Sequence, residues 1–189
     1  MATGKLIIFS APSGSGKTTI VKELLKIFLQ FEFSISATSR APRGQEQNGV
    51  DYFFLSQEEF RAKVEADEFV EWEEVYNGTC YGTLKSEMER IWSKGNVIIF
   101  DVDVMGGINL KRIFGDNARS IFIMPPSVEV LRERLIGRGT DSAETIEKRV
   151  AKAEFEISKA EQFDCVVVND ILADAVAQTK TIIEEFLAE

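Results

Sequence analysis

The sequence predicts an α/β fold in which a parallel sheet carries helices on both faces. Apolar runs of strand length alternate along the chain with segments whose apolar residues recur at helical spacing, the order typical of such a sheet. The runs expected to form its core strands are 6–9, 96–102, 120–124 and 164–168. Because these runs are almost continuously apolar, we expect each strand to be buried on both sides.

Length and composition favour one soluble domain. The 189 residues suffice for a well-cored domain with small insertions, and apolar residues make up 44% of them. No apolar run is long enough to span a membrane, and the first residues lead into a strand without a signal-peptide core, so we expect a cytoplasmic location. Cys80 and Cys165 lie in different sequence contexts and are expected to be reduced thiols.

Charge and residue usage exclude several classes of function. A net charge of −9 argues against a nucleic-acid partner, because binding a phosphate backbone requires a broad basic surface. The sequence has no histidine, so imidazole is neither the catalytic base nor a metal ligand. Two cysteines and scattered carboxylates offer no zinc spacing. We therefore expect no nucleic-acid, membrane or zinc partner.

The first strand leads into a phosphate-binding pattern. The run 6–9 breaks at Ser10 into the turn Ala-Pro-Ser-Gly-Ser-Gly, and 17–19 is Lys-Thr-Thr. A helix is expected next, because the following apolar positions form one stripe. The stripe consists of Ile20, Val21, Leu24, Leu25 and Phe28. Strand, glycine-rich turn and helix around Gly-Lys-Thr form the P-loop arrangement, although Ala11 stands where the strict pattern has glycine.

The residue types of this loop suit nucleotide phosphates. Gly14 and Gly16 let backbone amides converge on phosphate oxygens, because no Cβ blocks a positive φ or a close approach. The helix N-terminus adds its positive dipole, Lys17 adds a charge at the β and γ phosphates, and Thr18 adds a hydroxyl ligand for Mg²⁺. The alternative is a Gly/Ser-rich turn that happens to precede a lysine, and the flanking strand and helix argue against it.

Residues 34–84 are expected to form a small strand-rich insertion. The expected elements are a strand at 33–38, a strand at 50–55, a helix up to Ala66, and a hairpin of strands 69–76 and 79–82. Ser56 and Glu59 have the spacing of a capping box at the start of that helix. Asn77-Gly78 predicts a type I′ turn in the hairpin.

The remaining elements alternate between helix and strand. Five helices are expected between and after the core strands. The first covers 84–94, and the second follows Gly106 and Gly107 and ends at Phe114. The third runs from the Ser127 cap toward Ile136, the fourth begins at Asp141 with Glu144, and the last ends at about Leu187. The fourth of these helices should bury one face, made of Ile146, Val150, Ala153, Ile157 and Ala160. Asp101 and Asp103 follow a core strand, at the sheet edge where ligands bind in open α/β sheets.

Two arginines surround a proline turn early in the insertion. Arg40 and Arg43 flank Pro42 and could form a fork for a dianionic phosphate, because guanidinium groups match phosphate oxygens bidentately. The alternative is that they are ordinary surface charges. Tyr52 and Tyr81 offer phenol donors for the same phosphate, although each is equally compatible with a packing aromatic in a strand.

Glu71 is a candidate for recognising a guanine base. Strand alternation would place it on a polar outer face, which is the alternative interpretation. As an ionised carboxylate it only accepts hydrogen bonds, and guanine presents two adjacent donors, whereas adenine presents an acceptor at N1. Ser36 and Thr83 could donate to guanine O6. Such pairing can discriminate between bases by about 10⁴-fold.

Four arginines cluster in and after a helix broken by glycines. They are Arg132, Arg134, Arg138 and Arg149. Near transferring phosphates they would neutralise developing charge, and Gly137 and Gly139 would hinge a lid. The alternative is a helix surface on which they pair with glutamates. The glutamates within reach are Glu129, Glu133 and Glu147.

Taken together, these stretches resemble the guanylate kinase family, and the resemblance covers nearly the whole chain. The matching segments are 11–19, 36–43, 48–52, 68–72, 81–83, 101–103, 133–140 and 168–170. Several motifs in the right order are far more specific than a P-loop alone. Met105 departs from the family, which usually has glutamine there, and Ala-Pro-Ser-Gly at Ala11 occurs within it.

The resemblance implies transfer of the γ-phosphoryl group of ATP to GMP, giving ADP and GDP, with Mg²⁺. It implies a P-loop NTPase fold of three layers with a GMP-binding insertion and a helical lid. The corresponding division of the chain is core at 1–33, GMP-binding insertion at 34–84, core at 85–125, lid at 126–156 and core at 157–189. ATP and GMP would be the small-molecule partners, held in one cleft whose closure excludes water.

The resemblance also assigns roles by position. The residues implied at ATP are Ser13, Gly14, Ser15, Gly16, Lys17, Thr18, Thr19, Arg134, Asn169 and Asp170. Those implied at GMP are Ser36, Glu71, Thr83 and Asp103 for guanine, and Arg40, Arg43, Tyr52 and Tyr81 for its phosphate. The catalytic set comprises Lys17, Arg43, Arg138 and Arg149, and Thr18 binds Mg²⁺ with Asp101 acting on the metal through water.

Two other functions remain open at this point. Guanylate-kinase-like domains of scaffold proteins resemble this fold but have lost catalysis, and the presence of Lys17, Thr18 and both glycines argues against that class. A P-loop kinase for AMP, dTMP or a ribosyl phosphate is the second alternative. Glu71 is the residue that distinguishes it from an enzyme for GMP.

Overall fold

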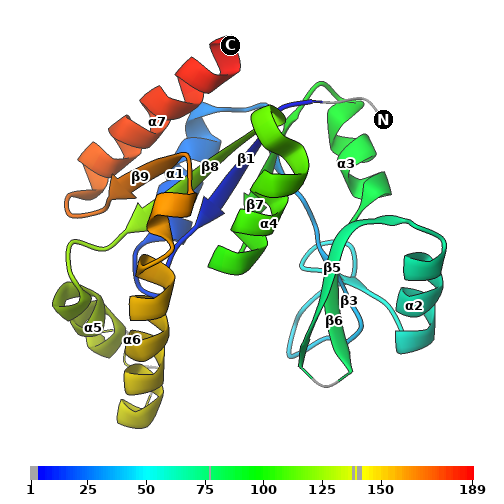
Figure 1. Ribbon diagram of the computed structural model, residues 1–189, viewed down its shortest axis with the longest axis horizontal. Coiled ribbons are helices and arrows are strands. Elements are labelled where there is room, and N and C mark those ends of the chain that lie inside the picture. Colours follow the sequence, from blue (N-terminus) through cyan, green and yellow to red (C-terminus); the bar gives the residue numbers. More distant parts are fainter. Residues whose placement is uncertain (1–3, 77, 138, 140–141) are drawn as a thin grey trace. The chain divides into compact units, whose positions relative to one another are not determined.

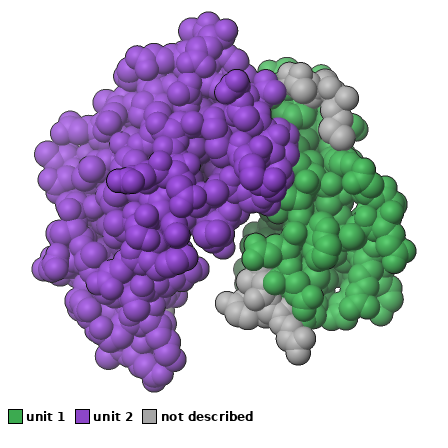
Figure 2. Space-filling view, in the orientation of Figure 1, with its two compact units in different colours: residues 1–4, 32–98 green, residues 5–31, 99–189 purple. Residues whose placement is uncertain are grey.

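The computed structural model describes residues 4–76, 78–137, 139 and 142–189. The chain divides into two compact units, one made of residues 1–4 and 32–98 and the other of residues 5–31 and 99–189 (Figure 2). The boundaries at 31/32 and 98/99 fall within strands β2 and β7. Among the described residues, no helix combines the length and apolarity that crossing a membrane requires.

A five-stranded sheet forms the centre of the fold, and the predicted α/β class is confirmed. Its strand order is β2-β7-β1-β8-β9. The strands are β1 (Leu6–Ser10), β2 (Phe31–Phe33), β7 (Val97–Asp101), β8 (Ala118–Met124) and β9 (Cys165–Val168). β8 runs parallel to both β1 and β9. Every residue of β1 is buried, as its continuous apolar run predicts.

Helices flank this sheet in the second unit (Figure 1). They are α1 (Lys17–Ile27), α4 (Val104–Phe114), α5 (Val128–Gly137), α6 (Ala143–Ile157) and α7 (Leu172–Ala188), with short 3₁₀ turns at Gly115–Asn117 and Ala160–Gln162. α4 packs on β1 and β8, while α1 packs with α7. The predicted stripe of α1 is buried at Ile20, Val21 and Leu24. Burial of one face per helix is what stabilises these elements.

The first unit contains a smaller sheet of order β4-β3-β6-β5. Its elements are β3 (Ala37–Thr38), β4 (Phe53–Phe54), α2 (Gln57–Glu65), β5 (Phe69–Tyr76), β6 (Thr79–Leu84) and α3 (Lys85–Trp92). Phe60 of α2 stacks on Phe69 of β5 with ring centroids 4.5 Å apart, inside a cluster with Ala37 and Leu84. The predicted capping box is confirmed, because Ser56 Oγ accepts from Glu59 N at 3.1 Å and Glu59 Oε2 accepts from Ser56 N at 2.7 Å.

Two predicted strands of this unit differ from the structure. The single strand expected at 33–38 is divided between β2 and β3. Between them the backbone hydrogen-bonds to a side chain instead of a neighbouring strand, since Ile35 N donates to Glu87 Oε1 at 3.0 Å. The strand expected at 50–55 shrinks to β4, because Val50 N and Asp51 N donate instead to Gln47 O in a turn. Asn77, part of the predicted hairpin turn, lies outside the described residues.

Two helix starts also differ. α4 begins before Gly106 and Gly107, because Asp103 caps it: its Oδ1 accepts from Gly106 N at 2.8 Å. The cap of α6 is Ser142, whose side chain accepts from Thr145 N. Asp141, expected to start that helix, lies outside the described residues. α6 ends at Ile157, so Ala160, expected on its buried face, lies instead in the 3₁₀ turn that follows. The other element ends fall within about two residues of expectation, the usual uncertainty of such boundaries.

Burial on both faces, expected of all four core strands, is wrong for β9. Val166 and Val168 are 37% and 51% exposed. Val166 and Val168 share one face of the strand, whereas Val167 on the opposite face is fully buried, so only one face of β9 is covered. α6 shows a second difference, because the buried position in its last turn is Glu156, while Ile157 is half-buried.

Candidate functional site

The P-loop has the conformation that its glycines predict. Gly14 and Gly16 have φ values of 100° and 89°, and Gly16 is the residue at which α1 begins. Thr18 and Thr19 are exposed, while Ser15 is fully buried. Because α1 has no side-chain cap, no side chain competes with an anion for the amides of its first turn, of which Thr19 N donates to Gly16 O at 3.1 Å.

Lys17 is held by the end of strand β7. Its Nζ donates to Val102 O at 3.1 Å and forms an ion pair with the Asp101 carboxylate. The Lys17 side chain is 16% exposed and that of Asp101 31% exposed. The β1–α1 loop and the β7 end therefore meet at one ammonium group, which a phosphate chain would share with Asp101.

Three further predicted residues contact the P-loop or each other. Arg149 Nη1 donates to Ser13 Oγ at 3.0 Å. The Asn169 side chain donates to Ser15 O at 2.7 Å and is buried, while Arg134 Nη2 donates to Asn169 O at 3.0 Å. Asp170 is exposed. These contacts bring residues of α5, α6 and the β9 end to the loop, as their assignment to one ATP site requires.

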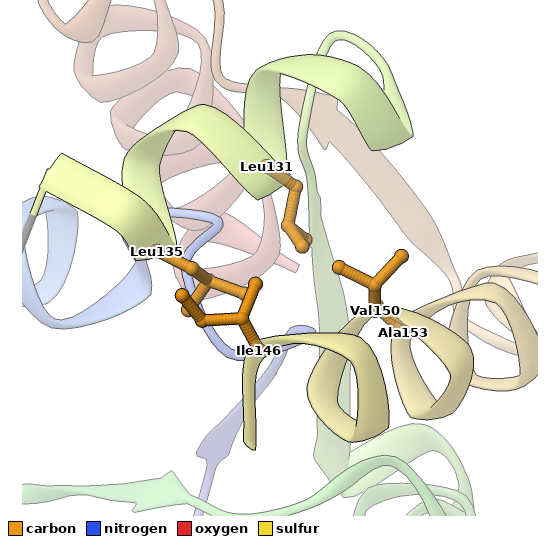
Figure 3. Packing of buried hydrophobic residues seen from close by; sticks show 5 residues of the cluster. All are labelled: Leu131, Leu135, Ile146, Val150 and Ala153. Atoms are coloured by element: carbon orange, nitrogen blue, oxygen red, sulfur yellow. The ribbon is translucent and has the colours of Figure 1, made fainter. Parts of the chain in front are cut away.

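The helices α5 and α6 pack through a small apolar cluster of their own (Figure 3). It consists of Leu131, Leu135, Ile146, Val150 and Ala153. The cluster lies against the P-loop, since a Cβ built on Gly14 would lie 3.3 Å from Leu135 and 3.4 Å from Leu131. Arg132 pairs bidentately with Glu147, which raises the pKa of Arg132, so for this arginine the surface alternative is correct. Arg138 lies outside the described residues.

A cavity of about 370 Å³ opens over the P-loop. The P-loop lines it together with Asp101, Val102, Asp103, Arg149, Lys152 and Glu156. Sequence reasoning missed Lys152 and Glu156. Burial raises the pKa of Glu156, and the charge of Lys152 opposes the rise. Their spacing from Arg149 was the available signal, because Lys152 lies about one helical turn after Arg149 and Glu156 about two turns after it.

The donor set at this cavity fits Mg²⁺ in its usual coordination. Thr18 and Asp101 offer a hydroxyl and a carboxylate at the cavity wall. Mg²⁺ on nucleotides typically takes one or two protein oxygens and completes its shell with phosphate and water. Within the described part of the chain, no group of three or more His, Cys, Asp or Glu side chains could hold a metal ion, so an all-protein cage does not occur there.

In the first unit, Glu71 and Thr83 come together across the β5–β6 ladder. They are register partners, and Thr83 Oγ1 donates to Glu71 Oε1 at 2.7 Å. Thr83 is 2% exposed, while Glu71 is half-buried. The carboxylate that sequence reasoning could not distinguish from a surface residue is therefore oriented by a buried hydroxyl.

Arg40, Tyr52 and Tyr81 form a second group in the same unit. Arg40 Nε donates to Tyr81 Oη at 3.1 Å, and the guanidinium carbon lies 5.0 Å from the Tyr52 ring centroid. The two tyrosine rings meet edge to face, with centroids 5.9 Å apart. Tyr81 of β6 is the register partner of Thr38 of β3, and Thr38 lies two residues before Arg40. The predicted phosphate donors thus share one end of the small sheet.

Glu46 is the residue of this group that sequence reasoning missed. Its carboxylate accepts from Arg40 Nη1 at 2.6 Å and Nη2 at 2.8 Å, and also from Arg43 N at 2.7 Å. The hydrogen bond from Arg40, followed by that from the Arg43 backbone, lowers the pKa of Glu46 to about 2. An acid three residues after Arg43 and six after Arg40 was a visible signal. The Arg43 side chain is exposed.

The two remaining guanine candidates have different surroundings. Ser36 is half-buried beside β3, and its carbonyl accepts from Phe53 N at 2.9 Å. Asp103 belongs to the second unit, where one of its carboxylate oxygens caps α4. Ser36, Glu71 and Thr83 therefore belong to one unit, and Asp103 lines the cavity over the P-loop.

Comparison with known proteins gives one consistent family. A family model described as guanylate kinase matches residues 3–186. A guanylate kinase of Bacteroides thetaiotaomicron is 59% identical over 98% of this chain and 91% of its own length, and one of Porphyromonas gingivalis is 58% identical over 98% and 99%. The crystal structure of guanylate kinase from Anaplasma phagocytophilum is similar with a TM-score of 0.71 and 30% identity, covering 98% of this chain and 87% of that one.

Proposed function

The chain belongs to the guanylate kinase family, and from this we propose that it transfers the γ-phosphoryl group of ATP to GMP, giving ADP and GDP. The observation that carries the proposal is the Glu71–Thr83 pair in the same small sheet as Arg40 and Tyr81. It combines an acceptor for the two donors of guanine with donors for a phosphate, which is the recognition that GMP requires.

ATP binding is assigned to the P-loop cavity. The amides of the loop and the α1 N-terminus face the phosphates, and Lys17 supplies a positive charge. Arg134, Asn169 and Asp170 are assigned to the adenosine. Because Asn169 donates its side-chain amide to Ser15 O, it supports the loop at the same time.

Catalysis in this proposal is positioning and electrostatics without a protein base. Phosphoryl transfer leaves little covalent chemistry for the protein, so stabilising charge on the phosphoryl oxygens is the main contribution. Lys17, Arg43, Arg138 and Arg149 are assigned to that role. Arg149 is supported by its hydrogen bond to Ser13 in the P-loop.

Guanine recognition is assigned to Glu71, Ser36, Thr83 and Asp103. Glu71 accepts from N1–H and the 2-amino group. Since the Thr83 hydroxyl donates its hydrogen bond to Glu71, Ser36 is the hydroxyl left to donate to O6. Arg43, Tyr52, Tyr81 and Arg40 are assigned to the GMP phosphate.

Mg²⁺ is the metal that the donor set fits. Thr18 would hold it directly and Asp101 through water, and when bound it supplies charge neutralisation between the phosphates. We assign residues 34–84 as the GMP-binding insertion and 126–156 as the lid, with the rest as core. Closure of both parts would exclude water, which competes for the phosphoryl group. We assign the enzyme to the cytoplasm, where it would meet its nucleotide substrates.

The test is a coupled assay of ADP formation with GMP, AMP, dTMP and no acceptor in parallel. We expect turnover with GMP and background rates with the others. Lys17→Met should abolish turnover, and Glu71→Ala should cause a large loss with GMP. Turnover without Lys17 would refute the assignment of the P-loop, and preference for another acceptor would favour a different kinase. Binding of GMP without any turnover would favour a noncatalytic binding module.

A further inference from the structure

The Arg40 guanidinium is almost fully committed inside the protein. Its Nε donates to Tyr81, Nη1 donates to Glu46 and to Ala41 O at 3.0 Å, and Nη2 donates to Glu46. Arginine has five N–H groups, and these contacts use four of them. The fork that could hold a phosphate bidentately therefore holds the Glu46 carboxylate instead.

The hydrogen bond to Tyr81 has a direction that matters for a ligand. Because Tyr81 Oη accepts from Arg40, its own O–H is free to donate to a further acceptor. A hydroxyl that accepts from a cation becomes a stronger donor, since hydrogen bonds in a chain polarise one another. Arg40 thus strengthens the hydrogen bond that the Tyr81 hydroxyl can donate to a ligand.

Glu46 also fixes the turn that presents Arg43. Besides binding Arg40, its carboxylate accepts from the Arg43 backbone amide. One carboxylate therefore joins both ends of the turn around Pro42. The Glu46 side chain is 25% exposed and that of Arg40 11% exposed, so the pair is partly shielded from solvent.

We propose that Glu46 is a positioning residue for the acceptor phosphate, acting through a relay of Glu46, Arg40 and Tyr81 while it holds the turn of Arg43. Arg43, Tyr52 and Tyr81 are direct phosphate donors, and Arg40 acts on the phosphate through its remaining N–H and through Tyr81. This inference rests on the proposed function, because it specifies how the GMP site binds its phosphate. The lowered pKa of Glu46 agrees with it, since the carboxylate stays ionised at neutral pH.

A competing role makes the opposite prediction. Glu46 could simply occupy the place of the phosphate on Arg40 and leave when GMP binds. Removing its charge would then tighten GMP binding, because a competitor has been lost. In the relay, the same change weakens binding, because Arg40 and the turn lose the group that orients them.

The experiment compares GMP with guanosine, which lacks the phosphate, by titration calorimetry on Glu46→Gln. The amide nitrogen of glutamine cannot accept from Arg40, so we expect GMP to bind about tenfold or more weakly, with guanosine binding unchanged. In the coupled assay, KM for GMP should rise while KM for ATP changes little. Tyr81→Phe should add less in the Glu46→Gln background than in the wild type, because both changes interrupt one relay.

Glu68→Gln is the matched control, since it removes an exposed ion pair with Lys63 in the same unit and should leave GMP binding unchanged. Equal losses for GMP and guanosine in Glu46→Gln would overturn the relay in favour of a purely structural role. Tighter or unchanged GMP binding would overturn it as well. If the wild type binds GMP but forms no ADP, the proposed function fails while the binding comparison still decides the role of Glu46.

Discussion

Replacing Gly16 with alanine should destabilise the protein by about 2–5 kcal/mol and weaken its binding of ATP. Gly16 has a φ of 89°, where an L-residue costs about 1–2 kcal/mol. The added Cβ would also collide with Asn169 Nδ2, which donates to Ser15 O at 2.7 Å. Breaking that buried hydrogen bond adds about 1–3 kcal/mol.

Gly95→Ala separates the two contributions. Gly95 has a φ of 75°, and a Cβ built on it meets nothing within 4 Å. It should therefore show the backbone cost alone, about 1–2 kcal/mol. Urea unfolding of both variants measures the difference, and Asn169→Ala combined with Gly16→Ala should cost less than the sum of the single changes, because the collision is relieved.

The refuting result is specific. If Gly16→Ala loses no more stability than Gly95→Ala, Asn169 does not restrict the space at Gly16. If stability falls as expected but KM for ATP is unchanged, the loop is not the place where ATP phosphates bind. Both outcomes are readable from the same two purified variants.

Two further changes probe the packing of α5 on α6 and an ion cluster that is sensitive to acid. Leu131→Ala should lower the free energy of unfolding by about 2–5 kcal/mol, because Leu131 is fully buried between α5 and α6. Ile136→Ala, on the exposed side of α5, should change it by no more than about 0.5 kcal/mol in urea unfolding. Equal losses of stability would contradict the packing in Figure 3. Burial alone would raise the pKa of Glu32, but hydrogen bonds from Arg90, Lys94 and Asn96 lower it to about 2, below its ordinary value of 4.5. Its stabilisation is therefore complete above about pH 5 and lost as the pH falls toward 2, so Glu32→Gln should flatten that part of the curve of Tm against pH, and a curve parallel to wild type would contradict the assignment.

Features that depend on a few neighbouring residues could be predicted from the sequence. The capping box of α2 is formed by Ser56 and Glu59, three positions apart, and the P-loop conformation follows from Gly14 and Gly16 between a strand and a helix. In both cases the atoms that interact belong to one short segment. No knowledge of the tertiary arrangement was needed.

Features that depend on what covers each face of a strand could not be predicted. Val166 and Val168 resemble the valines and isoleucines of the buried strands, yet they are exposed, while Val167 on the opposite face of β9 is fully buried. The local pattern of a strand does not tell whether other elements cover both of its faces. Glu156 escaped prediction for a similar reason, since an acid in a helical stripe is usually a solvent-facing residue.

Asp103 shows a third limit, because one side chain can serve two purposes. Its position after β7 predicted a ligand-binding acid, and the structure uses one of its oxygens to cap α4. The capping role could have been predicted, because Asp is a preferred N-cap residue and Asp103 lies three residues before Gly106. A residue interpreted for chemistry was not weighed for its effect on the backbone beside it.

The two regions to which we assign phosphate binding differ in how the sequence determines their geometry. In the P-loop the donors are backbone amides, so their placement follows from the chain path over six residues. In the smaller sheet the donors are side chains, and Arg40 meets Tyr81 only because Thr38 and Tyr81 are register partners in β3 and β6. A one-residue slip of that ladder would turn Tyr81 to the opposite face. In the proposed GMP site, acceptor binding therefore depends on the stability of a two-residue strand, and Glu46, whose carboxylate accepts from the Arg43 amide in the turn directly after it, is proposed to position more of the site than its place in a polar loop suggests.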